Sequence, residues 1–227
     1  MIKAIIWDLD GTLIKFKVNS LKARRKAIQI LKNSGVPKDK LSKDKSILEN
    51  VKISREYLSI NDFSDEIISG VLKQVNQAVI DIEHEAALKA ELTDGIINVL
   101  NFAKINGLQQ AIFTYNTYEN ALVSLRKVKI EHYFDIIAGR DTVTNLKPHP
   151  DHLNYICNKL NARNKEIVVI GDTDRDIESA INIGAYSIAL NTKLPSFLKR
   201  GTFQKANKII EPEEIPDLLI EVIENLL

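Results

Sequence analysis

Residues 2 to 7 form a nearly continuous apolar run that is rich in isoleucine. Such a run predicts a strand buried on both faces, as in the middle of a parallel sheet. It ends abruptly at two carboxylates, Asp8 and Asp10, which alternate with Leu9 and should therefore point to one side as the strand ends. Gly11 follows at once and lets the backbone turn closely. Charge is unusual at the end of a buried strand, because unpaired buried carboxylates are costly.

Residues 15 to 90 show helical rather than strand periodicity. The clearest apolar stripe repeats every three or four positions between Ile67 and Val79. Ser64 precedes it as a good helix cap, and two acidic residues suit the first turn. Weaker stripes cover residues 21–31 and 47–58. We therefore predict an all-helical domain at residues 15–90, with a small apolar core of its own.

Strands and helices alternate after residue 91. The predicted helices cover residues 96–105, 118–127, 151–160, 174–183 and 212–227, and the predicted strands cover residues 110–113, 134–138, 167–170, 185–190 and 208–210. Repeated strand–helix units indicate a parallel sheet covered by helices on both faces. The predicted fold is thus α/β, a doubly wound, Rossmann-like parallel sheet built from residues 1–14 and 91–227, into which the helical domain is inserted.

The composition narrows the class of protein but not its chemistry. Of the 227 residues, 44% are hydrophobic and 27% are charged, which is ordinary for a soluble globular protein. A net charge of +1 gives no argument for nucleic acid or for an anionic membrane surface. A lone cysteine, Cys157, excludes an intrachain disulfide framework. Without a run of transmembrane length or a signal-peptide pattern, we expect a cytoplasmic enzyme or binding protein.

Polar side chains follow further predicted strands or lie in the adjoining loops. Thr114 and Asn116 come directly after one strand, Lys147 precedes a helix, and Asp172 and Asp176 follow another strand. The carboxyl ends of parallel strands share one edge of the sheet, which is where ligands bind in such folds. We therefore expect these side chains to meet the two N-terminal carboxylates in one crevice.

The crevice would hold four carboxylates, those of Asp8, Asp10, Asp172 and Asp176. Together they would carry a charge of −4, which Lys147 alone cannot balance. Protons or a divalent cation must therefore be present, and ligation by oxygen alone suits Mg²⁺. A metal and a lysine beside a nucleophilic carboxylate make a site for phosphoryl transfer. We expect Asp8 to attack phosphorus and Asp10 to protonate the leaving oxygen and then to deprotonate water.

These segments resemble the four motifs of the haloacid dehalogenase superfamily, and within it the phosphatases of the phosphoglycolate phosphatase-like branch. The segments are Asp8-Leu9-Asp10-Gly11-Thr12, the strand end at Thr114, Lys147-Pro148-His149-Pro150, and Gly171-Asp172-Thr173-Asp174-Arg175-Asp176. The resemblance covers nearly the whole chain, because residues 15–90 fall where that branch carries a helical cap. Four motifs in order, each at a predicted strand end or adjoining loop, are far more specific than one.

The resemblance implies a role for each acid and for the lysine. Asp8 matches the nucleophile, which is also a metal ligand. Asp10 matches the general acid and base, with its main-chain carbonyl on the metal. Lys147 matches the lysine that steadies the nucleophile and the phosphoryl oxygens. Asp172 matches the acidic Mg²⁺ ligand, and Asp176 matches the second acid, which acts directly or through water.

The resemblance leaves some positions open. Thr114 matches the hydroxyl that holds the transferring phosphoryl group, and Asn116 would also bind the phosphate. The superfamily often has Thr-Asn or Ser-Asn here, whereas Tyr115 intervenes in this chain, so the role of Asn116 stays open. Asp174 either ligates the metal or caps the next helix, with capping favoured. For His149 and His152, a structural or surface role is favoured over metal ligation.

The predicted activity is that of a Mg²⁺-dependent phosphatase, a phosphoric monoester hydrolase that acts on a small phosphorylated metabolite through an aspartyl-phosphate.

Other activities remain as alternatives. A phosphomutase or a dehalogenase would use the same fold, and a non-catalytic phosphate-binding module would keep the same pocket. A dehalogenase does not need the acid at Asp10, and a module without catalysis would be expected to have lost some of the acids. The identity of the substrate, the oligomeric state and an open or closed cap do not follow from the sequence.

Overall fold

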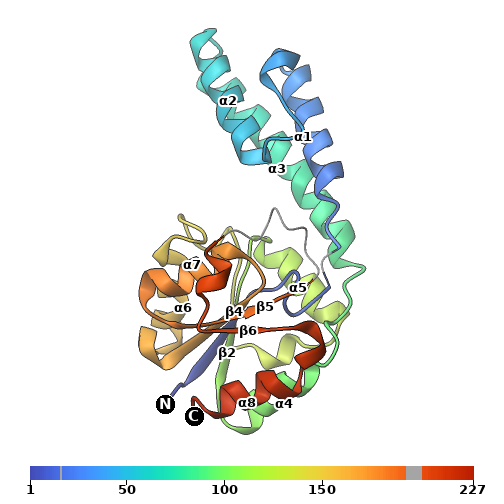
Figure 1. Cartoon of the computed structure of the whole chain (residues 1–227). Coiled ribbons are helices and arrows are strands. Elements are labelled where there is room, and N and C mark those ends of the chain that lie inside the picture. The colour runs from blue at the N-terminus through green and yellow to red at the C-terminus, as the bar shows by residue number, and fades with distance from the viewer. Residues whose placement is uncertain (16, 193–200) are drawn as a thin grey trace. The chain divides into compact units, whose positions relative to one another are not determined.

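The computed structural model describes residues 1–15, 17–192 and 201–227 (Figure 1). The chain forms two compact units, Met1–Lys17 with Ala87–Leu227, and Val18–Ala86. The sequence places these borders slightly differently, at 14/15 and 90/91. Main-chain hydrogen bonds join the two connecting segments within the first unit, from Lys15 N to Glu91 O at 2.8 Å and from Thr93 N to Leu13 O at 3.0 Å.

Within the described residues, the first unit contains one sheet of six strands in the order β3-β2-β1-β4-β5-β6. The strands are β1 (Ala4–Trp7), β2 (Gln109–Phe113), β3 (Ile136–Ala138), β4 (Ile167–Gly171), β5 (Tyr186–Leu190) and β6 (Lys208–Ile210). All neighbouring strands are parallel, and the N-terminal strand lies in the middle, with Trp7 opposite Ile112 on one side and Ile170 on the other. This confirms the predicted doubly wound α/β fold.

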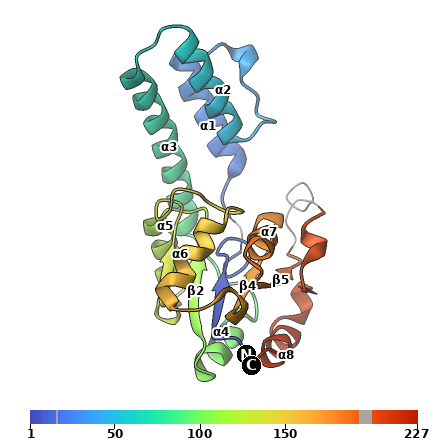
Figure 2. The ribbon, with the colours of Figure 1, turned by 90° about the vertical axis from the view of Figure 1, so that its left-hand side faces the viewer.

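Helices cover both faces of the sheet (Figures 1 and 2). One face carries α4 (Ile96–Ile105), α5 (Tyr118–Lys127) and α8 (Asp217–Glu224), and the other carries α6 (Pro150–Leu160) and α7 (Asp174–Ile183). The residues of β1 alternate between two apolar cores. Ile5 and Trp7 belong to the core under α4, α5 and α8, whereas Ala4 and Ile6 belong to the core under α6 and α7. A central strand buried on both faces explains the continuous apolar run in the sequence.

Short 3₁₀ turns and a close pair of termini complete this unit. The turns cover Glu131–Tyr133, Asn164–Glu166, Phe203–Lys205 and Pro212–Glu214. The two ends of the chain lie side by side in Figures 1 and 2, and Ile2 N donates a hydrogen bond to Leu226 O at 3.1 Å.

The second unit is helical, as predicted. It contains α1 (Ser20–Asn33), a 3₁₀ turn (Lys38–Lys40), α2 (Ile47–Ile60) and most of α3 (Asp65–Ala87). Ser64 Oγ accepts a hydrogen bond from Ile67 N at 3.4 Å, so the predicted cap of α3 is present. The three helices bury a small apolar core that includes Leu31, Leu58 and Val75.

The predicted helix at residues 212–227 is wrong in its first part. A 3₁₀ turn covers Pro212–Glu214, Ile215 is extended, with φ of −92° and ψ of 129°, and α8 begins only at Asp217. The reason is Pro216, whose ring disfavours a helical conformation in the preceding residue. The predicted strand at residues 134–138 is likewise shorter, because β3 pairs with β2 only from Ile136, which lies opposite Ala111.

Candidate active site

Three buried carboxylates gather at the carboxyl edge of the sheet. Asp8 follows β1, Asp172 follows β4, and Asp176 lies in the first turn of α7. One carboxylate oxygen from each lies within 4.8 Å of the others, and all three side chains are buried. The central position of β1, directly beside β4, brings these separate segments together.

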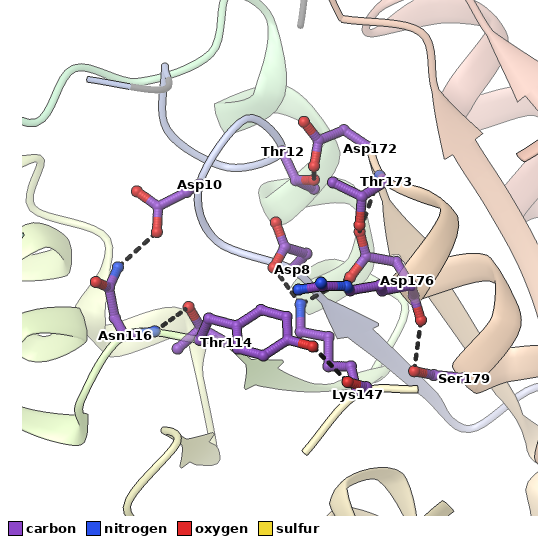
Figure 3. A network of polar contacts seen from close by, with 12 residues as sticks. Asp8, Asp10, Thr12, Thr114, Asn116, Lys147, Asp172, Thr173, Asp176 and Ser179 are labelled. Atoms are coloured by element: carbon purple, nitrogen blue, oxygen red, sulfur yellow. Dashed lines mark hydrogen bonds and ion pairs between the residues drawn. The ribbon is translucent and has the colours of Figure 1, made fainter. Parts of the chain in front are cut away.

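Lys147 supplies a cation to this group. Its Nζ donates hydrogen bonds to Oδ1 of Asp8 and, at 2.7 Å, to Oδ1 of Asp176, as Figure 3 shows. The residue lies in the segment before α6 and is only 4% exposed. Its Nζ also lies 4.0 Å from the ring centroid of Phe113, at the end of β2. The predicted lysine is therefore held between two of the three carboxylates.

Burial and mutual repulsion shift the ionisation of this cluster. Burial, together with the negative charge of Asp176, raises the pKa of Asp8 to about 6, although Lys147 acts in the opposite direction. Burial and the charges of Asp8 and Asp176 raise the pKa of Asp172 well above its ordinary value. Burial alone would lower the pKa of Lys147, but the two carboxylates that it binds outweigh this and raise it. The cluster therefore has more negative charge than its lysine can compensate.

Hydroxyl groups and a glycine hold Asp172 in place. Oγ1 of Thr12 donates to Asp172 Oδ1 at 3.4 Å, and Oγ1 of Thr192 donates to Oδ2 at 3.1 Å. Gly11 has a φ of +91°, and a Cβ at this position would lie only 2.1 Å from Asp172 Oδ2. A side chain at position 11 would thus collide with the carboxylate, which explains the glycine of the first motif.

Asp176 both caps a helix and faces the lysine. Its Oδ2 accepts hydrogen bonds from the main-chain N of Thr173 at 2.9 Å and from Thr173 Oγ1 at 2.6 Å. These contacts belong to a capping box at the start of α7. Gly171 makes room for this arrangement, because a Cβ there would lie 2.3 Å from that of Asp176. The orientation of the carboxylate is therefore set by the helix start.

The other predicted site residues lie at the end of β2 and beside it. Nδ2 of Asn116 donates to Asp10 Oδ2 at 2.5 Å, and the main-chain N of Asn116 donates to Thr114 Oγ1 at 3.1 Å (Figure 3). Asn116 is thus adjacent to both residues even though Tyr115 intervenes in the sequence. The carboxylate of Asp10 is not one of the three that gather around Lys147.

Asp174 and the two histidines have structural contacts. Thr173, rather than Asp174, is the cap of α7, so the capping interpretation of Asp174 is wrong. Asp174 Oδ1 instead accepts a hydrogen bond from the main chain of Phe203 at 2.6 Å. His149 caps α6. His152 Nε2 lies 3.0 Å from Ala138 O, and burial and the charge of Lys147 lower the pKa of this histidine to about 4.

Sequence reasoning did not anticipate two of the contacts. Thr192 follows β5 and binds Asp172, and the rule that polar residues at strand ends share one edge could have found it. The hydroxyl of Tyr115 donates to the main-chain carbonyl of Lys147, a contact over 32 residues for which the sequence carries no signal.

The motifs and their geometry agree with the comparisons with known proteins. The model of the haloacid dehalogenase-like hydrolase family matches residues 5–190. The chain belongs to this family. It is 26% identical to a phosphorylated carbohydrates phosphatase of Thermotoga maritima, over 97% of this chain and all of that protein. It is also 26% identical to a phosphoglycolate phosphatase of Aliivibrio fischeri, over 83% and 84% of the two chains.

Two solved structures resemble most or nearly all of the chain. β-Phosphoglucomutase of Clostridium difficile has a TM-score of 0.68 and 20% identity, with 99% of this chain and 98% of that chain covered. CbbY of Rhodobacter sphaeroides, solved in complex with phosphate, has a TM-score of 0.61 and 22% identity, with 92% and 94% covered. These two likenesses concern the fold. The family match and the relatives named phosphatases confirm the predicted enzyme class, a phosphoric monoester hydrolase of this family.

Among the described residues, no helix combines the length and the apolar character that a membrane span requires.

Proposed function

We propose that this enzyme hydrolyses a small phosphorylated metabolite, with Mg²⁺, through an aspartyl-phosphate on Asp8. The observation that carries the proposal is the placement of Asp8. Its carboxylate is buried at the end of the central strand, bound by Lys147 and gathered with Asp172 and Asp176. A carboxylate so placed has both a cation to steady it and further acids to hold a metal beside it.

The donor set fits Mg²⁺. The three gathered carboxylates offer only oxygen atoms, lie within reach of one ion and have a negative charge that Lys147 compensates only in part. We infer that Asp8, Asp172 and Asp176 would hold the ion, with the main-chain carbonyl of Asp10. A bound Mg²⁺ would neutralise negative charge on the phosphoryl oxygens and on the nucleophile.

The first step is nucleophilic attack. An oxygen of Asp8 forms a bond to phosphorus while the bond from phosphorus to the ester oxygen breaks. Protonated Asp10 gives its proton to that oxygen, so the product leaves as an alcohol. Lys147 holds Asp8 through Oδ1 and places its positive charge where the negative charge of the transferring group increases.

The second step is hydrolysis of the aspartyl-phosphate. Asp10, now a carboxylate, takes a proton from water, and the water oxygen bonds to phosphorus as the bond from phosphorus to Asp8 breaks. Inorganic phosphate leaves, and both acids return to their starting states. The hydrogen bond from Asn116 to Asp10 keeps this acid apart from the three carboxylates, in agreement with a separate proton-transfer role.

Thr114 and Asn116 are suited to bind the phosphoryl group. The hydroxyl oxygen of Thr114 accepts a hydrogen bond from Asn116 N, which does not use the hydroxyl proton. That proton is then able to bind a phosphoryl oxygen. Because Asn116 already donates to Asp10, we assign it mainly to the orientation of this acid and secondarily to the phosphate.

The test is phosphate release from p-nitrophenyl phosphate, with and without Mg²⁺. We expect activity that EDTA abolishes and that Asp8→Asn abolishes, with exposed Asp94→Asn as the matched control of unchanged activity. In Asp10→Asn, acid quenching and mass spectrometry should find a phosphoryl group on Asp8. Full activity in Asp8→Asn would refute the mechanism.

A second assay identifies the substrate class and the reaction type. Phosphorylated carbohydrates and phosphoglycolate, named for the relatives, form the first panel. Free phosphate is the expected product. An isomerised sugar phosphate without free phosphate would instead indicate a phosphomutase.

A further inference from the structure

Tyr115 interrupts the second motif and has contacts that neither neighbour makes. It is the second residue after β2, between Thr114 and Asn116, and is partly buried. Its hydroxyl donates a hydrogen bond to the main-chain carbonyl of Lys147. The side chain therefore links the end of β2 to the segment that carries the catalytic lysine.

The ring of Tyr115 is itself held from several directions. Its centroid lies 5.6 Å from Lys147 Nζ and 5.2 Å from the guanidinium of Arg175, in the first turn of α7. Nη1 of Arg140, in the segment after β3, donates to the main-chain carbonyl of Tyr115 at 2.7 Å. Residues from the segment between β3 and α6 and from α7 thus contact both the backbone and the ring of this tyrosine.

Lys147 needs such an anchor because no helix or strand fixes its backbone. It lies in the irregular segment between β3 and α6, yet its ammonium binds two carboxylates at once. The bond from His149 N to Leu146 O at 2.8 Å is local to this segment. Asn182 Nδ2 binds the next carbonyl, that of Pro148, at 2.9 Å. The hydrogen bond from Tyr115 is made to Lys147 itself.

The protonation state of Tyr115 suits a donor. Burial raises its pKa above the ordinary value, although the charges of Arg175 and Lys147 act in the opposite direction. The phenol therefore keeps its proton at neutral pH and donates it to the carbonyl.

We propose that Tyr115 is a positioning residue for catalysis: its hydroxyl fixes the backbone of Lys147 so that the ammonium stays on Asp8 and Asp176. The kinetic tests of this proposal rest on the proposed phosphatase function, because they measure phosphatase activity. The contact between Tyr115 and Lys147 is tested independently of any activity.

The kinetic test is Tyr115→Phe, which removes the hydroxyl and keeps the ring. We expect kcat to fall about fivefold with KM changed less than about twofold, because one hydrogen bond of about 1 kcal/mol that steadies the transition state is lost. The matched control is Tyr133→Phe, which removes a hydroxyl bonded to Asn101 at 2.5 Å on the surface and should leave kcat unchanged. A fall in melting temperature without a change in kcat would indicate a merely structural tyrosine and overturn the proposal.

A double-mutant cycle tests whether the effect acts through Lys147. In the Lys147→Ala background, Tyr115→Phe should cause no further loss of the residual kcat, because the group that it positions is gone. Independent, multiplying losses would overturn the proposal.

The activity-independent test is ¹⁵N NMR of the lysine ammonium groups. A buried ammonium bound to two carboxylates should exchange its protons slowly and give a separate signal, which Lys147→Ala identifies by its loss. Tyr115→Phe should broaden or shift this signal, and Tyr133→Phe should not. An unchanged signal in Tyr115→Phe overturns the proposal. If the wild-type enzyme releases no phosphate but the signal responds, the proposed function fails and the positioning contact stands.

Discussion

Carboxylates lie at both ends of the central strands, and their pKa values are shifted in opposite directions. Before β4, at the amino edge, Glu166 accepts hydrogen bonds from Arg163 Nη2 at 2.7 Å and forms an ion pair with Lys3 at 2.9 Å. The hydrogen bonds from the side chain and main chain of Arg163, and then that from Lys3, lower the pKa of Glu166 to about 2. After β1, at the carboxyl edge, burial raises the pKa of Asp8 to about 6.

The difference shows where the molecule tolerates uncompensated charge. Glu166 has two cations of its own, whereas Asp8 and Asp176 share Lys147 and lie next to Asp172. A buried excess of negative charge costs stability unless something positive binds to it. Such an excess at the carboxyl edge points to a site for a cation and a reacting group.

The largest contrast should come from removing the lysine at each edge. Lys147→Met leaves two buried carboxylates without their cation and should cost about 3–5 kcal/mol in the free energy of unfolding of the metal-free protein. Catalysis should fall by a factor on the order of 10³. Lys3→Met, the matched control, removes an ion pair whose lysine is exposed and leaves Glu166 bound to Arg163, so it should cost much less. Urea unfolding of both variants measures this, and equal losses would contradict the contrast.

Metal binding should depend on the carboxyl edge alone. Mg²⁺ at about 100 times its dissociation constant should stabilise the wild-type protein by about 2.7 kcal/mol, and EDTA should reverse this. Asp172→Asn should abolish the Mg²⁺-induced rise in melting temperature. The neighbouring Asp174→Asn should retain it, because Asp174 lies outside the gathered carboxylates. A rise that survives in Asp172→Asn would contradict the assignment of this residue as a ligand.

The pH dependence of stability should have opposite signs at the two edges. At the carboxyl edge, the pKa of Asp8 is about 6 in the folded state and near 3.8 in the unfolded chain, so folding takes up a proton between these values. The metal-free protein should therefore be more stable near pH 4.5 than at pH 7, by roughly 1–2 kcal/mol from this group. Asp8→Asn should lose this rise. Thermal unfolding in EDTA at both pH values measures it.

The smallest expected effect is at the amino edge. The pKa of Glu166 is lowered to about 2 from an ordinary value of 4.5, so its stabilising contribution is present above pH 4.5 and disappears as pH falls toward 2. Glu166→Gln should be slightly less stable than the wild-type protein at pH 7 and equally stable near pH 2. A difference that persists at pH 2 would show that lost packing, rather than lost charge, is responsible.

The sequence predicts those features that are local or periodic. Residues 96–105, 118–127 and 174–183 are helices within the predicted bounds, because their apolar spacing and caps act within a few residues. The break before Pro216 is also local, because the proline ring acts on the residue before it. The motifs at the ends of β1, β2 and β4 can be predicted to lie close together, because the carboxyl ends of parallel strands share one edge of the sheet.

What the sequence determined by itself was the family, the parallel sheet and the acids that its carboxyl edge would present, because each depends on residue order and short spacing. Only the tertiary structure decided which groups touch. It places Lys147 between Asp8 and Asp176. It also shows that Asn116 donates a hydrogen bond to Asp10, and that Tyr115 donates one to the main chain of Lys147. These contacts join residues up to 139 positions apart, and their partners are selected by packing and desolvation, for which no local pattern exists.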